Sequence, residues 1–226
     1  MNGPVHFIYL GGPFLPQHAR AIVTAKVHSK DVVLHCATRP QGDLPSGISL
    51  EPLYLNGWLR KHPIKLANVK DLFCWKALLD DGGLYLDLDT ISLRPVWDLI
   101  GDDAQMCVGR EYPEGDNHPN PFNSACVIGR KNSPILSLLY GETFEILRSG
   151  EATWGAVGPH LLSRTVARFP DEFSVAPYRA FNGWSYHAIG EFYADPRDPG
   201  EPCRVIHLYS SDHQVEFSED TWTPTT

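Results

Sequence analysis

The stretch of residues 84–93 constrains the fold more than any other part of the sequence. Its first half alternates leucines with aromatic or acidic residues, in the order Leu84, Tyr85, Leu86, Asp87, Leu88 and Asp89. Side chains two positions apart on a β-strand project to the same face, so the alternation predicts a strand with its leucines on one face. Both aspartates would then lie together on the other face.

Strand and helix patterns alternate in the chain ahead of this segment. Residues 5–10 and 31–36 are short apolar runs that predict buried strands, and apolar residues recur at helical spacing between them over 17–29. This order predicts an α/β fold with parallel strand pairing. A further strand is expected at 48–55. A helix is expected over 64–79, beginning after Pro63 and ending before Gly82.

The second half of the chain carries the same two patterns around long polar loops. Strands are expected at 105–109, 125–129, 173–176 and 204–209, and helices at 134–147 and 159–168. The Pro-rich connections 111–123 and 195–202 are expected to form a binding site and not to link domains, because neither flank could fold alone. We therefore expect one domain over residues 1–226.

The composition indicates which classes of partner and which cellular compartment to expect. With 42% hydrophobic residues, the chain can bury the core of one domain, and a formal net charge of −8 gives no positive field for nucleic acid or an anionic membrane. We find no basic, apolar secretion signal at the start and no apolar run that predicts a transmembrane segment. Five cysteines form no close pairs, which is typical of reduced thiols. A soluble, cytoplasmic protein is expected.

Asp87 and Asp89 are the strongest candidates for chemistry. Two carboxylates on one face offer hard oxygen ligands, which Mn2+ and Mg2+ prefer, and such a cation usually keeps positions for water and substrate phosphates. A cation held there could neutralise the negative charge that develops on a departing diphosphate. The competing interpretation is a pair of exposed acids in a turn, which is common in proteins.

Two motifs resemble a known enzyme family. Residues 66–95, LANVKDLFCWKALLDDGGLYLDLDTISLRP, and residues 6–12, HFIYLGG, are similar in kind and order to the DXD sugar transferases with a GT-A fold. That family includes the sugar-transferring domains of large clostridial toxins, yeast-type α-1,6-mannosyltransferases and relatives of α-1,4-galactosyltransferase. Weaker similarities at 122–134, 158–162 and 205–209 extend the resemblance over most of the chain.

The resemblance implies a nucleotide-diphospho-sugar transferase fold, in which helices flank a mixed central sheet. Residues 1–95 would form the nucleotide-sugar-binding half and residues 96–226 the acceptor-facing half. The implied reaction moves a hexose-type sugar from a nucleoside diphosphate, expected to be UDP, to a glycan or other hydroxyl acceptor. The resemblance also implies retention of the anomeric configuration, with Mn2+ or Mg2+ as the cofactor.

The resemblance further implies roles for individual side chains. Asp71 would bind hydroxyls of the donor sugar, Asp87 the ribose and the metal, and Asp89 the metal directly, so these three are the candidate catalytic residues. The remaining donor contacts would surround the nucleobase, ribose and phosphates and come from Ile8, Tyr9, Leu66 and Tyr85.

His207 and the acceptor groove complete the candidate site. The resemblance makes His207 a metal ligand from the last strand, whereas a buried histidine bonded to a backbone carbonyl is the ordinary alternative. An acceptor groove is expected in the loop-rich second half, because amide and aromatic side chains often line carbohydrate pockets. The candidate acceptor residues are Glu111, Asn123, Trp154 and His160.

Two departures from the family pattern bear on activity. Cys74 stands where the family usually carries an arginine, and Lys70, one helical turn earlier, is the candidate to replace it as a point charge. The family's Ser-Trp after the histidine is also replaced, by the sequence Ser211, Asp212 and His213. These departures leave open a catalytically degenerate protein that binds a nucleotide sugar or a glycan without turnover.

An aspartyl-phosphate phosphatase is a further alternative, because its signature also places two aspartates at the end of an apolar strand. That motif normally lies on the first strand, with one residue between the second acid and the threonine. Here Thr90 directly follows Asp89, which disfavours the phosphatase.

Overall fold

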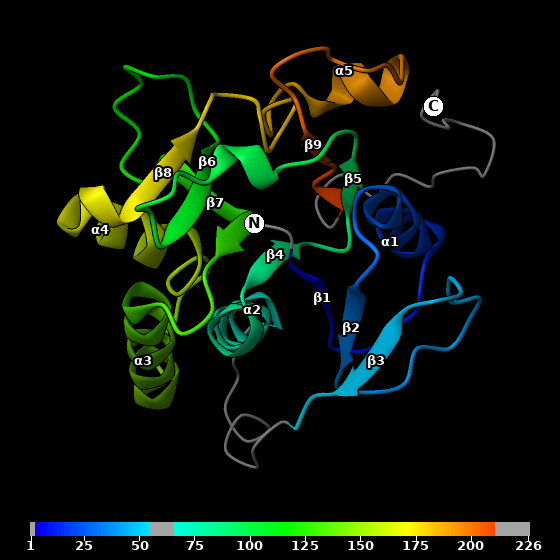
Figure 1. The fold of residues 1–226 in the computed structure, drawn as a ribbon, viewed down its shortest axis with the longest axis horizontal. Coiled ribbons are helices and arrows are strands. Elements are labelled where there is room, and N and C mark those ends of the chain that lie inside the picture. Colours follow the sequence, from blue (N-terminus) through cyan, green and yellow to red (C-terminus); the bar gives the residue numbers. More distant parts are fainter. Residues whose placement is uncertain (1–2, 55–65, 211–226) are drawn as a thin grey trace.

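A seven-stranded mixed sheet runs through the computed structural model, which describes residues 3–54 and 66–210 (Figure 1). The strand order is β3-β2-β1-β4-β7-β6-β8. Neighbours among β1 to β4 are parallel, β7 is antiparallel to β4 and β6, and β8 is parallel to β6. The strand bounds are β1 Val5–Tyr9, β2 Val32–Cys36, β3 Ser49–Pro52, β4 Gly83–Leu86, β6 Met106–Arg110, β7 Phe122–Gly129 and β8 Phe173–Ala176. The predicted mixed α/β fold is confirmed.

Helices cover both faces of this sheet (Figure 1). Helix α1 packs on one face, where Ile22 joins the apolar cluster of Phe7 and Leu34. Helices α2, α3 and α4 pack on the other face, where buried Trp75 and Leu139 meet Tyr85. The helix bounds are α1 Pro16–His28, α2 Leu66–Asp81, α3 Pro134–Ser149, α4 Pro159–Arg168 and α5 Ile189–Ala194, with 3-10 turns at Trp97–Leu99 and Pro170–Glu172.

The connectivity of the sheet creates a place for a ligand between β1 and β4. From β1 the chain runs outward to β2 and β3, and it then returns to pair β4 with the other side of β1. Loops after adjacent parallel strands diverge where the strand order reverses in this way, and ligands bind in the crevice outside their carboxyl ends. Asp87 follows β4 at this edge of the sheet.

The predicted continuous strand over 84–93 is wrong, because the chain turns at residues 87–89. The alternation holds in β4, where Leu84 and Leu86 face one apolar cluster and Tyr85 the other. The Thr90 hydroxyl then donates to the Asp87 carbonyl at 2.8 Å and closes the turn. Beyond it, β5 (Thr90–Ser92) pairs antiparallel with β9 (Val205–His207) in a second, two-stranded sheet.

Backbone geometry explains the sharp passage from α2 to β4. The helix ends at Asp81 and Gly82 follows with φ +68, a left-handed conformation that favours glycine. Gly83 also has a positive φ of +109, and a Cβ there would overlap the Pro4 carbonyl oxygen. The helix was expected over 64–79; its observed end lies two residues later, and Pro63 with residues 64 and 65 lies outside the described residues.

Most other predicted elements lie within a few residues of those observed. Helix α4 matches the predicted range 159–168, and β8 matches 173–176, whereas α5 was not predicted. With six residues, α5 is too short to show a helical repeat.

All five cysteines are free thiols. Within residues 3–54 and 66–210, no helix combines the length and apolar character needed to cross a membrane.

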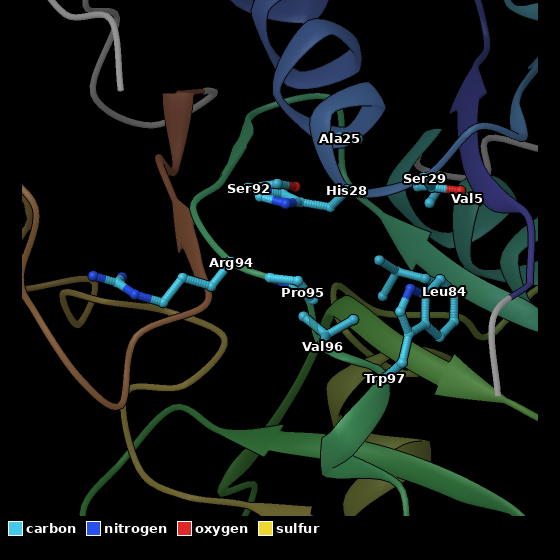
Figure 2. A pocket seen from close by; sticks show the side chains of 10 residues that line it. All are labelled: Val5, Ala25, His28, Ser29, Leu84, Ser92, Arg94, Pro95, Val96 and Trp97. Carbon is cyan, nitrogen blue, oxygen red and sulfur yellow. The ribbon is translucent and has the colours of Figure 1, made fainter. Parts of the chain in front are cut away.

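A small cavity lies where the end of α1 meets β4 and the segment after β5 (Figure 2). Its volume of about 10 Å³ is the size of one water molecule. The buried Ser92 hydroxyl is on its wall, while Arg94 extends outward to an ion pair with Asp198. A cavity of this size excludes any organic ligand, so it is not a substrate site.

Candidate active site

A cleft of about 890 Å³ opens at the edge of the sheet where β1 and β4 end. Its volume is at the upper end of the range for small-molecule sites, about 300–1,000 Å³. Segments distant in sequence form its walls, including α2, the turn after β4, β7, the loop after β6, the start of α4 and the chain after β9. The cleft therefore exists only when both halves of the chain have folded together.

Asp87, Asp89 and His207 converge at the floor of the cleft. One potential ligand atom from each lies within 4.8 Å of the others. The convergence arises from the turn after β4 and from the pairing of β5 with β9, in which Thr90 lies opposite His207. The expected meeting of the two carboxylates on one strand face is thus replaced by a meeting across a turn.

Asp89 is held by groups from the end of the described chain. His207 Nε2 lies 3.4 Å from Asp89 Oδ1, and the Ser210 backbone N–H donates to Oδ2 at 2.9 Å. The Ser210 hydroxyl also donates to Oδ2, at 3.2 Å. Burial alone would raise the pKa of Asp89, but His207 and the Ser210 hydrogen bond outweigh it and lower the pKa. Asp89 is therefore ionised near neutral pH.

His207 responds to the same neighbours in the opposite sense. Burial lowers the pKa of an imidazole, but the nearby carboxylates of Asp89, Asp87 and Glu111 raise the pKa of His207 above its ordinary value. Its Nδ1 also lies 3.5 Å from the Asn123 side-chain amide. The ring is therefore fixed between β7 and the turn, so the alternative of a histidine bonded only to a backbone carbonyl does not describe it.

Lys70 on α2 supplies the positive charge of the cleft. Its ammonium donates to both carboxylate oxygens of Asp87, at 2.8 and 2.9 Å, and lies 3.4 Å from Asp71 Oδ1. Burial would lower the pKa of Lys70, but Asp71 and Asp87 together raise it. Among the cleft-lining residues that the structure describes, Lys70 is the only lysine or arginine.

Asp71 lies deeper, at the base of the same wall. It is 3% exposed, and the Ser124 hydroxyl donates to its Oδ1 at 3.1 Å. Burial raises the pKa of Asp71 against the opposing effect of Lys70. Gly158 packs so closely on Asp71 that a Cβ on this glycine would overlap Oδ2. One face of the carboxylate is thus covered by backbone, and the residue still lines the cleft.

The converging side chains fit a divalent cation. Two carboxylates and an imidazole are donors that Mn2+ accepts, and the oxygen donors also suit Mg2+. Asp89 and His207 contact each other, while Asp87 shares its oxygens with Lys70 and with the Tyr85 hydroxyl, which donates to Oδ1.

The other predicted site residues fall into two groups. Those that line the cleft are Ile8, Glu111, Asn123, Trp154 and His160. Tyr9 does not, because it belongs to the opposite face of β1, where its ring packs against Phe14 and its hydroxyl bonds the Gly12 carbonyl. Leu66 is 68% exposed at the start of α2 and is not part of the cleft wall. Tyr85 is buried and contacts two residues of the cleft wall, through its hydrogen bond to Asp87 and through Lys70, whose ammonium lies 5.8 Å from the ring centroid.

Sequence reasoning missed several polar residues of the site. Ser124 and Ser210 contact the acids directly, and Tyr209 donates to Glu111 at 3.2 Å. These contacts join positions 53 to 121 residues apart, so no local pattern announces them. Cys74 is fully buried beside Trp75 in an apolar cluster, so it does not enter the cleft. Residues 211–213, where the family pattern also departs, lie outside the described residues.

Comparisons with known proteins identify the fold. No protein-family model matches the sequence, and a comparison with curated proteins also gives no match. Among solved structures, the PaToxG glycosyltransferase is 14% identical with a TM-score of 0.54, covering 74% of this chain and 69% of its own. The glycosyltransferase GlyE of Streptococcus pneumoniae TIGR4 is 17% identical with a TM-score of 0.55, and its match covers 100% of this chain.

The chain spans only 57% of the length of GlyE. A third similar structure is a glycosyltransferase involved in the glycosylation of the major capsid of PBCV-1, which is 14% identical with a TM-score of 0.50 over 93% of this chain and 96% of its own. At such identities the likeness establishes the fold. The protein has a glycosyltransferase fold of the GT-A type, as the resemblance implied.

Proposed function

We propose that the protein is a metal-dependent glycosyltransferase that moves a sugar from a nucleoside-diphosphate sugar, with UDP as the expected nucleotide, to a hydroxyl acceptor. The observation that carries the proposal is the convergence of Asp87, Asp89 and His207 in a cleft at the switch point of a glycosyltransferase fold. Residues 1–95 would bind the donor and residues 96–226 would face the acceptor.

The charge of the cleft supports a need for a divalent cation. Four carboxylates line the cleft, from Asp71, Asp87, Asp89 and Glu111, against the single ammonium of Lys70. A diphosphate entering this wall would meet net negative charge and would be repelled. Asp89, His207 and Asp87 would hold a divalent cation, which would remove that repulsion and would stabilise negative charge on the leaving diphosphate.

Side chains from the first half of the chain are suited to bind the donor. Asp71, fixed by Ser124 and Gly158, can accept hydrogen bonds from donor-sugar hydroxyls at the cleft wall. Ile8 at the end of β1 offers an apolar contact for a nucleobase. Lys70 holds the Asp87 carboxylate in one orientation through two hydrogen bonds. These residues would contact the sugar and the nucleobase of the donor.

The transfer itself exchanges one bond for another. The acceptor hydroxyl oxygen forms a bond to the anomeric carbon, and the bond from that carbon to the diphosphate oxygen breaks with its electron pair remaining on the diphosphate. The proton of the acceptor hydroxyl leaves as the new bond forms, and the departing diphosphate can receive it. Retention of the anomeric configuration is the outcome that the family resemblance implies.

A catalytically degenerate binding protein is the second candidate. The specific observation that favours it is the pairing of Lys70 with both oxygens of Asp87, because an internal ammonium can substitute for part of the charge that a metal would supply. Such a protein would bind a nucleotide sugar or a glycan and release no product.

Nucleoside diphosphate release tests the proposal. We expect the protein, incubated with Mn2+ and a panel of UDP- and GDP-sugars, to release the diphosphate from one donor, and we expect chelation of the metal to stop this release. Asp89→Asn should lower the rate at least about a hundredfold, because it removes a charged ligand. Its melting temperature should also fall, because the lowered pKa of Asp89 means that the ionised carboxylate stabilises the folded state, but asparagine keeps an acceptor for the Ser210 N–H and should allow folding.

A matched control distinguishes the effect of changing a site residue from the effect of removing any acidic side chain. Asp103 is exposed and does not line the cleft, so Asp103→Asn should retain wild-type release. Calorimetry with UDP and Mn2+ distinguishes the second candidate, because binding without release of diphosphate from any donor would establish a degenerate binder. Full activity of Asp89→Asn would overturn the metal assignment.

A further inference from the structure

Trp154 is a solvent-exposed tryptophan, unlike the tryptophans of the core. Its side chain is 60% exposed, whereas Trp75 and Trp184 are buried. The indole lies in the wall of the cleft, next to Gly155 and close to Pro159 and His160 at the start of α4. An exposed indole in the wall of a cleft offers apolar area that a ligand can cover, and burial of this area would contribute to binding.

The exposure does not come from a loosely attached loop. The Asn68 side-chain amide on α2 donates to the Thr153 carbonyl at 3.0 Å, and the buried Trp75 indole donates to the Val157 carbonyl at 3.1 Å. Both donors are buried side chains of one helix. The turn that carries Trp154 is therefore fixed on either side of it, and the indole is held out into the cleft by a rigid support.

A second ring orients the indole. The rings of Trp154 and His160 are 6.2 Å apart between centroids and cross at 79°, an edge-to-face contact. The His160 N–H of the backbone donates to the Gly155 carbonyl at 3.0 Å, which ties the two residues into one unit. Gly155 permits this approach, since its φ is +73 and a Cβ would press against the His160 ring.

The same turn contacts the proposed sugar-binding acid. Gly158, four residues after Trp154, lies against Asp71 so closely that no Cβ fits between them. Asp71 and the Trp154 ring thus belong to one continuous wall of the cleft. A ring on the indole would lie beside a donor sugar held at Asp71, which is the position that an acceptor must occupy.

We propose that Trp154, supported by His160, is a stacking platform for a pyranose ring, and that the acceptor is therefore a saccharide. The inference rests on the proposed transferase function and names its acceptor class. The apolar C–H face of a pyranose covers an aromatic ring, while its outward hydroxyls need polar partners. Glu111 and Asn120 supply such partners in the same cleft.

Saccharide binding in the absence of any donor tests the platform directly. Protein labelled with 15N-tryptophan would be titrated with maltose, lactose, cellobiose and mannobiose, and the Trp154 indole resonance would be assigned by its loss in Trp154→Phe. We expect at least one disaccharide to shift this resonance. Trp154→Ala should weaken binding of that disaccharide about tenfold or more, and Trp154→Phe, which keeps an aromatic face, by less than about threefold.

Tyr54→Ala is the matched control, because Tyr54 is an exposed aromatic residue that does not line this cleft. It should bind the disaccharide as the wild type does. The inference is overturned if none of the four disaccharides shifts the Trp154 resonance, or if Trp154→Ala binds with unchanged affinity. It is also overturned if the protein transfers sugar to a peptide hydroxyl and to none of the saccharides.

The failure of this inference and that of the proposed function are distinguishable. Disaccharide binding that depends on Trp154, without release of diphosphate from any donor, would support the platform and contradict the transferase. Release of diphosphate without saccharide binding would support the transferase and contradict the platform.

Discussion

Lys70 occupies a position where one side chain balances two acids. Its ammonium contacts Asp71 on α2 and Asp87 in the turn after β4, and all three groups are shielded from solvent to a large extent. Removing one partner of such a group leaves a carboxylate without its counter-charge, which costs more than the loss of an exposed ion pair. The lysine therefore stabilises the folded protein in the absence of a cation, because its charge offsets the repulsion between the two carboxylates.

Lys70→Ala should lower the free energy of unfolding by about 3 kcal/mol, measured by urea denaturation without metal. Mn2+ should then raise the melting temperature of this variant more than that of the wild type, because the cation supplies the missing charge at Asp87. Lys76→Ala provides the control. Lys76 pairs with Asp80 on the exposed side of the same helix, and its loss should cost less than about 0.5 kcal/mol. Equal stability and equal Mn2+ response in wild type and Lys70→Ala would contradict the assigned role.

At this scale the sequence allowed part of the site to be predicted. The spacing of Asp87 and Asp89 predicted a shared carboxylate site, and the family resemblance added His207, which the structure places beside them. Tyr9 could not be placed correctly, since the face to which a strand residue points depends on which face the helices leave open. Ser210 could not be found either, because its contact with Asp89 depends on tertiary pairing alone.

At the scale of elements, the close contact between α2 and the residue before α4 positions the proposed sugar-binding wall. Gly158 immediately precedes α4 and packs on Asp71, and β7 supplies Ser124 to the same carboxylate. A side chain at position 158 would have to displace the acid, because the space is already filled by the Asp71 carboxyl group and by the Ser124 hydroxyl, 2.9 Å from the Cβ position. The glycine therefore sets the distance between two elements.

Gly158→Ala should reduce sugar transfer about ten- to a hundredfold, since displacement of a positioning group by a fraction of its contact distance is costly in rate. The loss should be seen mainly as a higher KM for the donor in steady-state assays. Gly141→Ala in the middle of α3 is the control, because a Cβ there meets no atom within 4 Å and alanine favours helix. Unchanged donor KM in Gly158→Ala would show that Asp71 does not contact the donor.

Element prediction succeeded where periodicity was long and failed where tertiary pairing decided the outcome. The apolar repeats of α3 and α4 were sufficient, because each helix buries one side against the sheet. The segment 84–93 misled because its alternation continues through the turn at Leu88. What breaks the strand is the pairing of β5 with β9, a partner more than a hundred residues away that no local pattern specifies.

At the scale of the whole molecule, a buried histidine pair couples stability to pH. His6 Nδ1 and His35 Nε2 lie 3.0 Å apart across β1 and β2, and His6 Nε2 bonds the Gly82 carbonyl at 2.9 Å. Burial lowers the pKa of both rings, and for His35 the charge of His6 adds to the effect and brings the pKa to about 4. The native state therefore holds both rings neutral.

Stability should fall as the pH decreases from about 6.5 to about 4, because the unfolded chain binds protons there that the native pair rejects. The expected contribution of His35 over this interval is about 3 kcal/mol, which measurements of the free energy of unfolding in urea at several pH values would check. His35→Gln should flatten this part of the curve, whereas His187→Gln, at an exposed position, should leave it unchanged. A His35→Gln curve parallel to that of the wild type would refute the assignment.

The pairing of β5 with β9 has a consequence for how the protein matures. A ribosome would release Asp87 and Asp89 well before His207, and 121 positions separate Asp89 from Ser210. The nascent chain can therefore complete its large sheet while the proposed metal site is still unassembled. Activity would therefore require the pairing of β9 with β5. A translation product that ends before β9 would be partly folded and inactive.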